Sequence, residues 1–221
     1  MNDYRRKVKQ LLAHAERYHE RYYLNKTFYG PSYFFHTRAL KELKSGNFTR
    51  ALEYLYAVLP SWGMHRMGKG GPKMEEFEVF KKSVLRIKPE IYKLRKVDFN
   101  KVSEVDWQLI ELVFKGIKVM DVGTFLIGNS KVMAHLLSNL IPPIDREYTL
   151  TYLDGRGYIN NGKNGIEWQW QKMRSIIEGF YMPVARDERF RQLASGWLAN
   201  RKQYRWDTSI IKIIDNLIVG A

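Results

Sequence analysis

The stretch LIGNSKVMAHLLSNLIPPIDREYT, residues 126–149, predicts a short glycine turn, a helix, a stop and the start of a second helix. Gly128 and Asn129 tolerate a left-handed backbone, and Ser130 is a preferred helix N-cap. The apolar residues that follow recur every three or four positions, and the prolines at 142–143 end the helix. We therefore expect two helix N-termini that lie close together across a compact turn.

Each of the two expected helix starts carries a charged side chain. Lys131 falls in the first turn of the first helix, where the helix dipole disfavours an ammonium by roughly a few tenths of a kcal/mol. The same field favours the uncharged amine, which is the form that a nucleophilic lysine needs. Asp145 falls at the start of the second helix, where a carboxylate is favourable in any case. We predict that Lys131 and Asp145 line one cleft as catalytic residues; a purely architectural aspartate is the alternative.

Helical periodicity extends outward from this stretch over most of the chain. Apolar spacings of three and four predict further helices over 4–24, 33–44, 48–59, 74–87, 106–115, 167–180, 185–202 and 208–219. Residues 154–165, dense in glycine and asparagine, are the one segment where we allow a small β-hairpin. The prediction is an all-α protein with a single helical domain, 1–221. Within this domain we allow for two lobes, 1–100 and 101–221, around a groove, and for a hairpin element at 116–150.

Composition excludes several classes of function. The 221 residues contain no cysteine, which removes disulfides, thiolate metal sites and cysteine nucleophiles. The five histidines show no metal-ligand spacing, and neither a G-x-S-x-G turn nor a P-loop is present, so we expect no metal and no cofactor. Apolar runs fall short of the roughly 20 residues of a membrane span, and no secretion signal is apparent. The expected compartment is the cytoplasm, with no membrane partner.

Charge is the most informative bulk property. Lys and Arg number 37 against 23 Asp and Glu, which gives a formal charge of +14, and residues 1–50 hold half of that excess. Such a field attracts phosphates, and the many aromatic side chains could stack on bases. We predict a nucleic-acid partner, double-stranded DNA, with Arg5, Arg6 and Lys7 among its contacts. A solubility charge without a ligand is the alternative.

The glycine-rich segment SWGMHRMGKGGPK, residues 61–73, precedes an expected helix. Its backbone N–H groups could hold a phosphate at that helix start, although a plain surface loop fits equally well. Its basic and imidazole side chains extend the predicted nucleic-acid contacts to His65, Arg66, Lys69 and Lys73.

The opening stretch resembles the hairpin of the helix-hairpin-helix DNA glycosylases, which runs roughly L-P-G-V-G-x-K-x-A and is followed by P-[IV]-D. The resemblance implies that Lys131 attacks the sugar C1′ and that Asp145 assists. It also implies that the backbone of Gly128, Asn129 and Ser130 holds a DNA phosphate. With the lysines aligned, the family's two glycines fall on Ile127 and Asn129, and the interval of 14 residues from lysine to aspartate is shorter than in the family.

The resemblance implies a base-excision enzyme, a DNA glycosylase or glycosylase/AP lyase acting on a flipped damaged base. Arg146 would hold phosphate, and the expected base pocket draws on five side chains, Trp62, Met64, Trp168, Trp170 and Trp206. A non-catalytic helical nucleic-acid-binding or assembly protein is the alternative. In the segments 62–68, 128–137, 142–149 and 206–221, and over most of its length, the chain also resembles a group of uncharacterised microbial proteins, which suggests no function.

Overall fold

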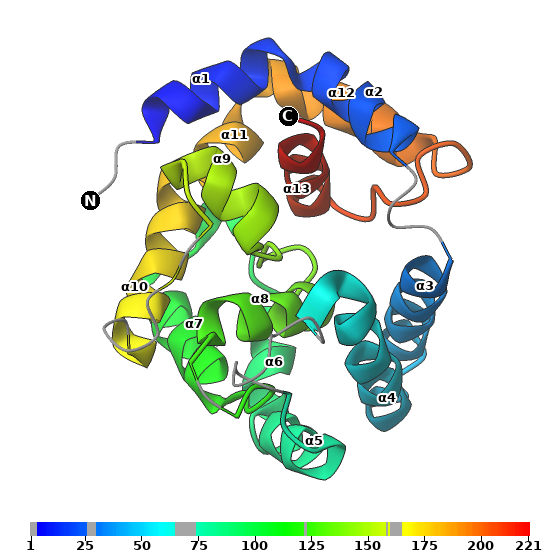
Figure 1. Cartoon of the computed structure of the whole chain (residues 1–221), viewed down its shortest axis with the longest axis vertical. Helices are drawn as coiled ribbons and strands as arrows, with labels where there is room; N and C mark the ends of the chain where they lie inside the picture. The colour runs from blue at the N-terminus through cyan, green and yellow to red at the C-terminus, as the bar shows by residue number, and fades with distance from the viewer. Residues whose placement is uncertain (1–3, 26–29, 65–73, 122, 158, 160–164) are drawn as a thin grey trace.

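A computed structural model describes residues 4–25, 30–64, 74–121, 123–157, 159 and 165–221 (Figure 1). All regular elements in these ranges are helical, so the all-α prediction is confirmed. The α-helices are α1 Arg5–Ala13, α2 Ala15–Leu24, α3 Pro31–Lys44, α4 Phe48–Leu59, α5 Phe77–Arg86, α6 Lys88–Leu94, α7 Glu104–Gly116, α8 Phe125–Leu136, α9 Thr151–Asp154, α10 Ile166–Ile176, α11 Met182–Arg186, α12 Glu188–Ala199 and α13 Ile210–Gly220. Shorter π-helical or 3-10 turns are η1 Pro60–Met64, η2 Phe99–Lys101, η3 Arg146–Leu150 and η4 Ile177–Tyr181.

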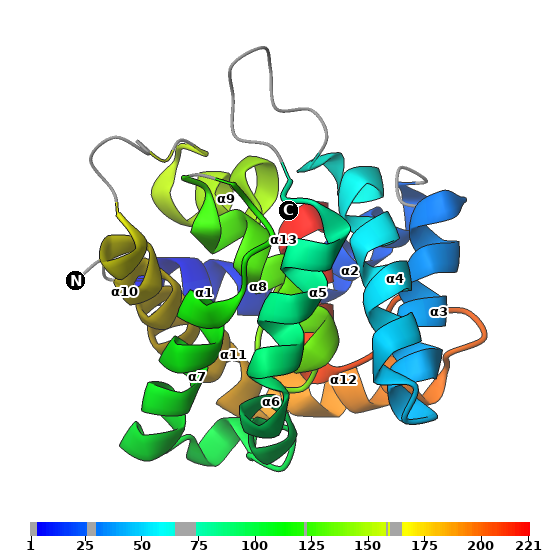
Figure 2. The same cartoon turned by 90° about the horizontal axis from the view of Figure 1, so that it is seen from below.

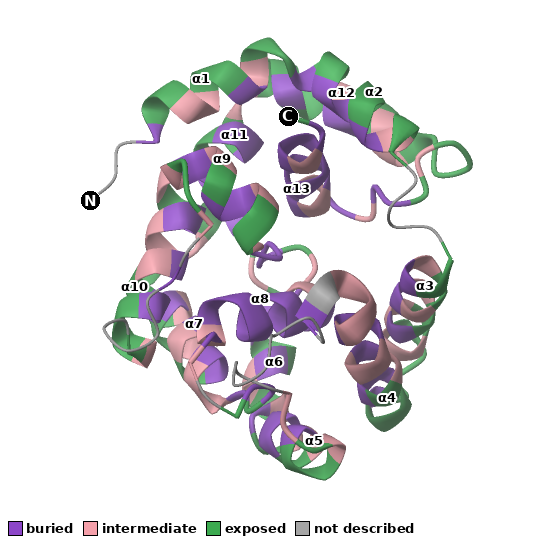
Figure 3. Ribbon diagram, in the orientation of Figure 1, coloured by how far each residue is buried: buried purple, intermediate pink, exposed green. Residues whose placement is uncertain are grey.

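The helix α8 lies inside the ring that the outer helices form (Figure 1). Figure 3 shows it buried along most of its length, whereas the outer helices such as α1 and α5 each keep an exposed face. A helix that is apolar on nearly all sides is expected in the centre of a helical protein. Its neighbours include α3 and α4, which stand side by side (Figure 2), and α7 and α10. This central position fixes the surroundings of every side chain on α8.

The two ends of the chain pack together through α2 and α13. Gly220 makes this contact close, because a Cβ atom there would lie 2.0 Å from the backbone oxygen of Tyr18. The helices thus group as chain ends, α1 and α2 with α11 to α13, and chain middle, α3 to α8. This grouping differs from the expected lobes 1–100 and 101–221, because apolar faces formed at opposite ends of the chain are buried against each other.

The segment 154–165 contains no strand in its described part, residues 154–157, 159 and 165; the remainder lies outside the described residues. Within the described ranges, strand-like pairing is limited to one isolated antiparallel bridge between Met74 and Met120. In the same ranges no helix has the length and apolar character needed to cross a membrane.

Candidate active site around Lys131 and Asp145

The helix that carries Lys131 begins earlier than the sequence predicts. α8 starts at Phe125 with Thr124 as its N-cap, directly after Gly123, whose φ of 83° favours glycine. Lys131 is therefore in the middle of the helix, and the prediction that it occupies a first turn is wrong. The argument from the helix dipole does not apply to it, because that field is confined to the first turn.

The three residues before Lys131 have packing roles inside α8. Gly128 has no side chain, so Met120 and Val119 can approach to 2.7 and 3.0 Å of where its Cβ would be. Asn129 donates through its side-chain amide to the carbonyl oxygens of Phe114 and Ile117, at 2.7 and 3.2 Å, and so caps the end of α7.

Ser130 joins α8 to the segment after it, because its hydroxyl accepts the backbone N–H of Ile144 at 3.0 Å. Gly128, Asn129 and Ser130 are all buried, so in this structure none of them lies on the surface where a DNA phosphate would bind, and that contact stays a prediction. At the N-terminus of α8 itself, the backbone N–H of Leu126 already has a protein acceptor, because it donates to Gln169 Oε1 at 2.8 Å.

Lys131 and Asp145 are nonetheless in direct contact, as the sequence predicts. Lys131 Nζ donates to Asp145 Oδ2 at 2.8 Å and to the carbonyl oxygen of Trp62 at 3.1 Å. Only 4% of Lys131 is exposed. Through these two hydrogen bonds, Lys131 connects its own helix, α8, to η1 and to the start of η3.

Asp145 is also the N-cap of η3. Its Oδ1 accepts the backbone N–H groups of Glu147 and Tyr148 at 2.7 and 3.3 Å. Burial acts to raise the pKa of this carboxyl, but the Lys131 ammonium and the two N–H groups outweigh burial and hold the pKa below its ordinary value. Asp145 is thus an anion with each oxygen already bound.

Two buried histidines, His135 and His36, form a chain of contacts that starts at the backbone carbonyl of Lys131. His135 Nδ1 is 2.9 Å from the carbonyl oxygen of Lys131, and His36 Nδ1 is 3.0 Å from His135 Nε2. A carbonyl oxygen can only accept, so His135 carries its proton on Nδ1, and His36 must then donate to His135 Nε2. The remaining nitrogen, His36 Nε2, is a buried acceptor without a partner among the described residues.

Both imidazoles of this pair are neutral. Burial lowers the pKa of His135 to about 4, and burial together with His135 and Lys212 lowers the pKa of His36 well below its ordinary value. The sequence analysis missed both histidines, because nothing in their spacing of 99 residues indicates that they meet.

Two of the predicted pocket aromatics lie beside this pair. The ring centroids of Trp62 and Trp206 are 5.7 and 5.1 Å from that of His36. Lys212 Nζ lies 5.7 Å from the Trp62 centroid and 6.0 Å from the Trp206 centroid. A cavity of about 10 Å³, lined in part by His36, Trp62 and Lys212, separates these groups. It has room for about one water molecule.

Lys212 brings a second buried carboxyl to the site. Its Nζ is 2.6 Å from Asp215 Oδ2. Burial raises the pKa of Asp215, the ammonium of Lys212 opposes that rise, and the nearby Asp145 charge adds to it. In the sequence, Lys212 and Asp215 fit the helical periodicity of residues 208–219, and no motif marks them as site residues.

Neither a protein-family model nor a curated protein or solved structure matches this chain. The candidate site therefore rests on its geometry and on the local resemblance of residues 126–149.

The other predicted pocket residues lie elsewhere. Trp170 is fully buried against Trp107 and Phe114, and Met64 is buried in the hydrophobic core. Trp168, 44% exposed, is on the surface of α10. Trp170 and Met64 therefore act as core side chains, as large aromatic and thioether groups often do, whereas Trp168 lies on the surface. The predicted contacts His65, Arg66, Lys69 and Lys73 lie outside the described residues.

The predicted N-terminal contacts and Arg146 come from two segments that touch through Lys7 and Tyr152. Arg5, Arg6 and Arg146 are exposed. Lys7 is half-buried, with its Nζ 4.7 Å from the ring centroid of Tyr152, whose hydroxyl donates to the carbonyl oxygen of Lys7 at 3.2 Å. Tyr152 is in α9, the helix that follows η3 directly, so α1 contacts the element next to η3.

Proposed function

We propose that this protein is a DNA-binding base-excision enzyme in which Lys131 is the nucleophile and Asp145 its proton acceptor. The observation that carries the proposal is the contact of 2.8 Å between the lysine ammonium and the aspartate carboxylate. A nucleophilic amine needs a partner within hydrogen-bond distance that can take its proton. The sequence resemblance to the helix-hairpin-helix glycosylases assigns these same two residues to that chemistry.

The proposed step begins with transfer of a proton from Lys131 to Asp145. The free amine forms a bond to the sugar C1′ while the bond from C1′ to the base breaks, and the base leaves with the proton held by Asp145. Ring opening, with transfer of the amine proton to the ring oxygen, then gives an imine. Because Lys131 is buried, the η1 segment that contacts it through Trp62 must move when a flipped nucleotide enters.

Binding of DNA is supported by the formal charge of +14 and by the exposed cations Arg5, Arg6 and Arg146. These cations are suited to phosphate contacts, which position a duplex without reading its sequence.

The decisive experiment is borohydride trapping on duplex oligonucleotides that carry an abasic site or a damaged base. We expect a covalent adduct with the natural protein and none with Lys131→Gln, which cannot form an imine. Lys172→Gln is the matched control, because Lys172 Nζ forms a partly buried ion pair of similar length, 2.7 Å from Asp154 Oδ2. Adducts that persist in Lys131→Gln would assign the nucleophile elsewhere.

A second candidate is a non-catalytic nucleic-acid-binding protein. Its supporting observation is that Lys131 is 4% exposed and has two protein acceptors, as expected for a structural ion pair. This candidate predicts salt-dependent DNA binding without trapping on any lesion. If the natural protein shows neither trapping nor DNA binding, nucleic acid is not its partner.

A further inference from the structure

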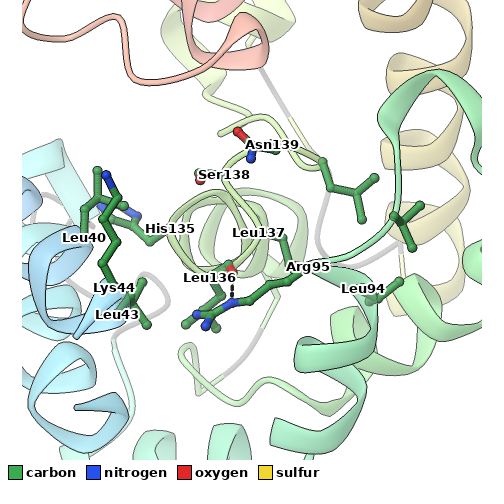
Figure 4. A pocket seen from close by; sticks show the side chains of 12 residues that line it. Leu40, Leu43, Lys44, Leu94, Arg95, His135, Leu136, Leu137, Ser138 and Asn139 are labelled. Atoms are coloured by element: carbon green, nitrogen blue, oxygen red, sulfur yellow. Dashed lines mark hydrogen bonds between the residues drawn. The ribbon is translucent and has the colours of Figure 1, made fainter. Parts of the chain in front are cut away.

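A second cavity lies at the opposite end of α8 from its N-cap (Figure 4). Its volume is about 230 Å³, and it opens between α3, the end of α6 and the turn after α8. The floor and walls are largely leucine side chains, Leu40, Leu43, Leu94, Leu136, Leu137 and Leu140. The cavity is separate from Lys131 and Asp145, neither of which lines it.

Two cations line this leucine cavity from opposite walls. Lys44 comes from the last residue of α3, and Arg95 follows α6 (Figure 4). No Asp or Glu is among the lining residues. In the described part of the chain, no carboxylate forms an ion pair with Lys44 or Arg95. The cavity therefore has two positive charges and no anion of its own.

Arg95 is held in one orientation. Its Nε donates to the carbonyl oxygen of Leu136 at 3.0 Å (Figure 4). Its guanidinium lies 5.1 Å from the ring centroid of Tyr92 and 5.8 Å from that of Phe48. Burial lowers the pKa of Arg95 from its ordinary value, yet a guanidinium in a protein stays charged. Among the described residues, the two terminal nitrogens have no hydrogen-bond acceptor, so they remain available to a ligand.

We propose that this leucine cavity binds a small organic phosphate monoester. A phosphate monoester carries a charge of about −1.5 to −2 at neutral pH and so balances two cations, whereas a carboxylate would leave one of them unpaired. The guanidinium fork of Arg95 matches two phosphate oxygens. The leucines take the apolar body of the ligand, and the neutral ring of His135 forms part of the wall.

The test is calorimetric titration with phenyl phosphate, compared with inorganic phosphate, benzoate and phenol. We expect phenyl phosphate to bind at least about fivefold more tightly than each of the others, because only it satisfies both the cations and the leucines. Equal affinity for inorganic phosphate or for benzoate would overturn the proposal.

Variants locate the binding. Lys44→Gln is expected to weaken phenyl phosphate binding about tenfold. Lys41→Gln is the matched control, because Lys41 is exposed on the same helix and does not line the cavity. Arg95→Lys keeps the charge and removes the fork, so it should also weaken binding. Unchanged affinity in folded Lys44→Gln, or an equal weakening in Lys41→Gln, contradicts the assignment.

The NMR signals of the His135 ring give a second readout on the unaltered protein. They should shift during titration with phenyl phosphate, because the ring lines the cavity. Saturable binding without a shift at His135 would place the ligand elsewhere.

Discussion

His36 and His135 form a hydrogen-bonded chain that ends at the Lys131 carbonyl, and each ring keeps one proton only. Adding a second proton to either ring would place a positive charge in a fully buried environment near Lys212. In the unfolded chain the same rings take up a proton near pH 6.5. The native state therefore resists a protonation that the unfolded state accepts.

This difference predicts destabilisation of the protein as the pH falls below the ordinary pKa of histidine. Between about pH 4, the pKa of folded His135, and pH 6.5, the unfolded state binds more protons than the native state, so the free energy of unfolding rises with pH. Each histidine contributes up to about 1.4 kcal/mol per pH unit. Urea unfolding from pH 4.5 to 7.5 measures the slope. His36→Asn should reduce it; an equal slope in the natural protein and in His36→Asn would contradict the lowered pKa of His36.

A second prediction at this scale concerns the ion pair of Lys131 and Asp145. Asp145→Asn keeps an acceptor for the Glu147 and Tyr148 N–H groups but leaves the Lys131 ammonium buried without a counter-ion. We expect the free energy of unfolding to fall by about 2 to 3 kcal/mol, below the full cost of breaking a buried pair because Asp145 is partly exposed. Combining it with Lys131→Met should restore part of this stability. Chemical unfolding in a double-mutant cycle tests this; additive effects would indicate that the two side chains do not interact.

At the scale of elements, the contact between α2 and α13 is closest at Gly220. Gly220→Ala adds a methyl group against the backbone oxygen of Tyr18, so we expect about 1 to 3 kcal/mol of destabilisation from overpacking. Gly196→Ala in α12 is the control, because a Cβ there meets nothing within 4 Å. That change should stabilise the protein by about 0.5 to 1 kcal/mol. Thermal unfolding distinguishes the two variants. If Gly220→Ala also stabilises the protein, α2 and α13 can move apart at this contact without a loss of stability.

The sequence was sufficient to predict the helical class and the proximity of Lys131 to Asp145, because both follow from local periodicity and from a short connection. It was insufficient for the start of α8. Gly128, Asn129 and Ser130 have turn propensity, yet all three are in the helix, where Asn129 and Ser130 bond to Phe114 and Ile144 in neighbouring segments. The site around His36 and Lys212 was beyond prediction for the same reason, since helices from both halves of the chain build it.

For the whole molecule, the charge of +14 predicts a steep salt dependence of DNA binding. Neutralising Arg6 and Lys9, both exposed on α1, should lower the slope of log affinity against log salt by about 0.9 for each phosphate that the variant no longer neutralises. Fluorescence anisotropy of a labelled duplex at several salt concentrations measures the slope. Neutralising Lys82 and Lys93, exposed on α5 and α6, is the control, because both helices lie in the lower half of Figure 1 whereas α1 runs along the top. An equal change in both double variants would indicate attraction by net charge alone, without a localised interface.

The packing of α2 against α13 also bears on how the protein is made. Tyr18 and Tyr22 on α2 are buried in the fold, and α13 begins at residue 210. At about 5 to 20 residues per second, the ribosome adds α13 roughly 10 to 40 s after α2. Throughout that interval the face of α2 that packs on α13 lacks that helix as its partner. A nascent chain interrupted before residue 210 should therefore present this face to chaperones and proteases.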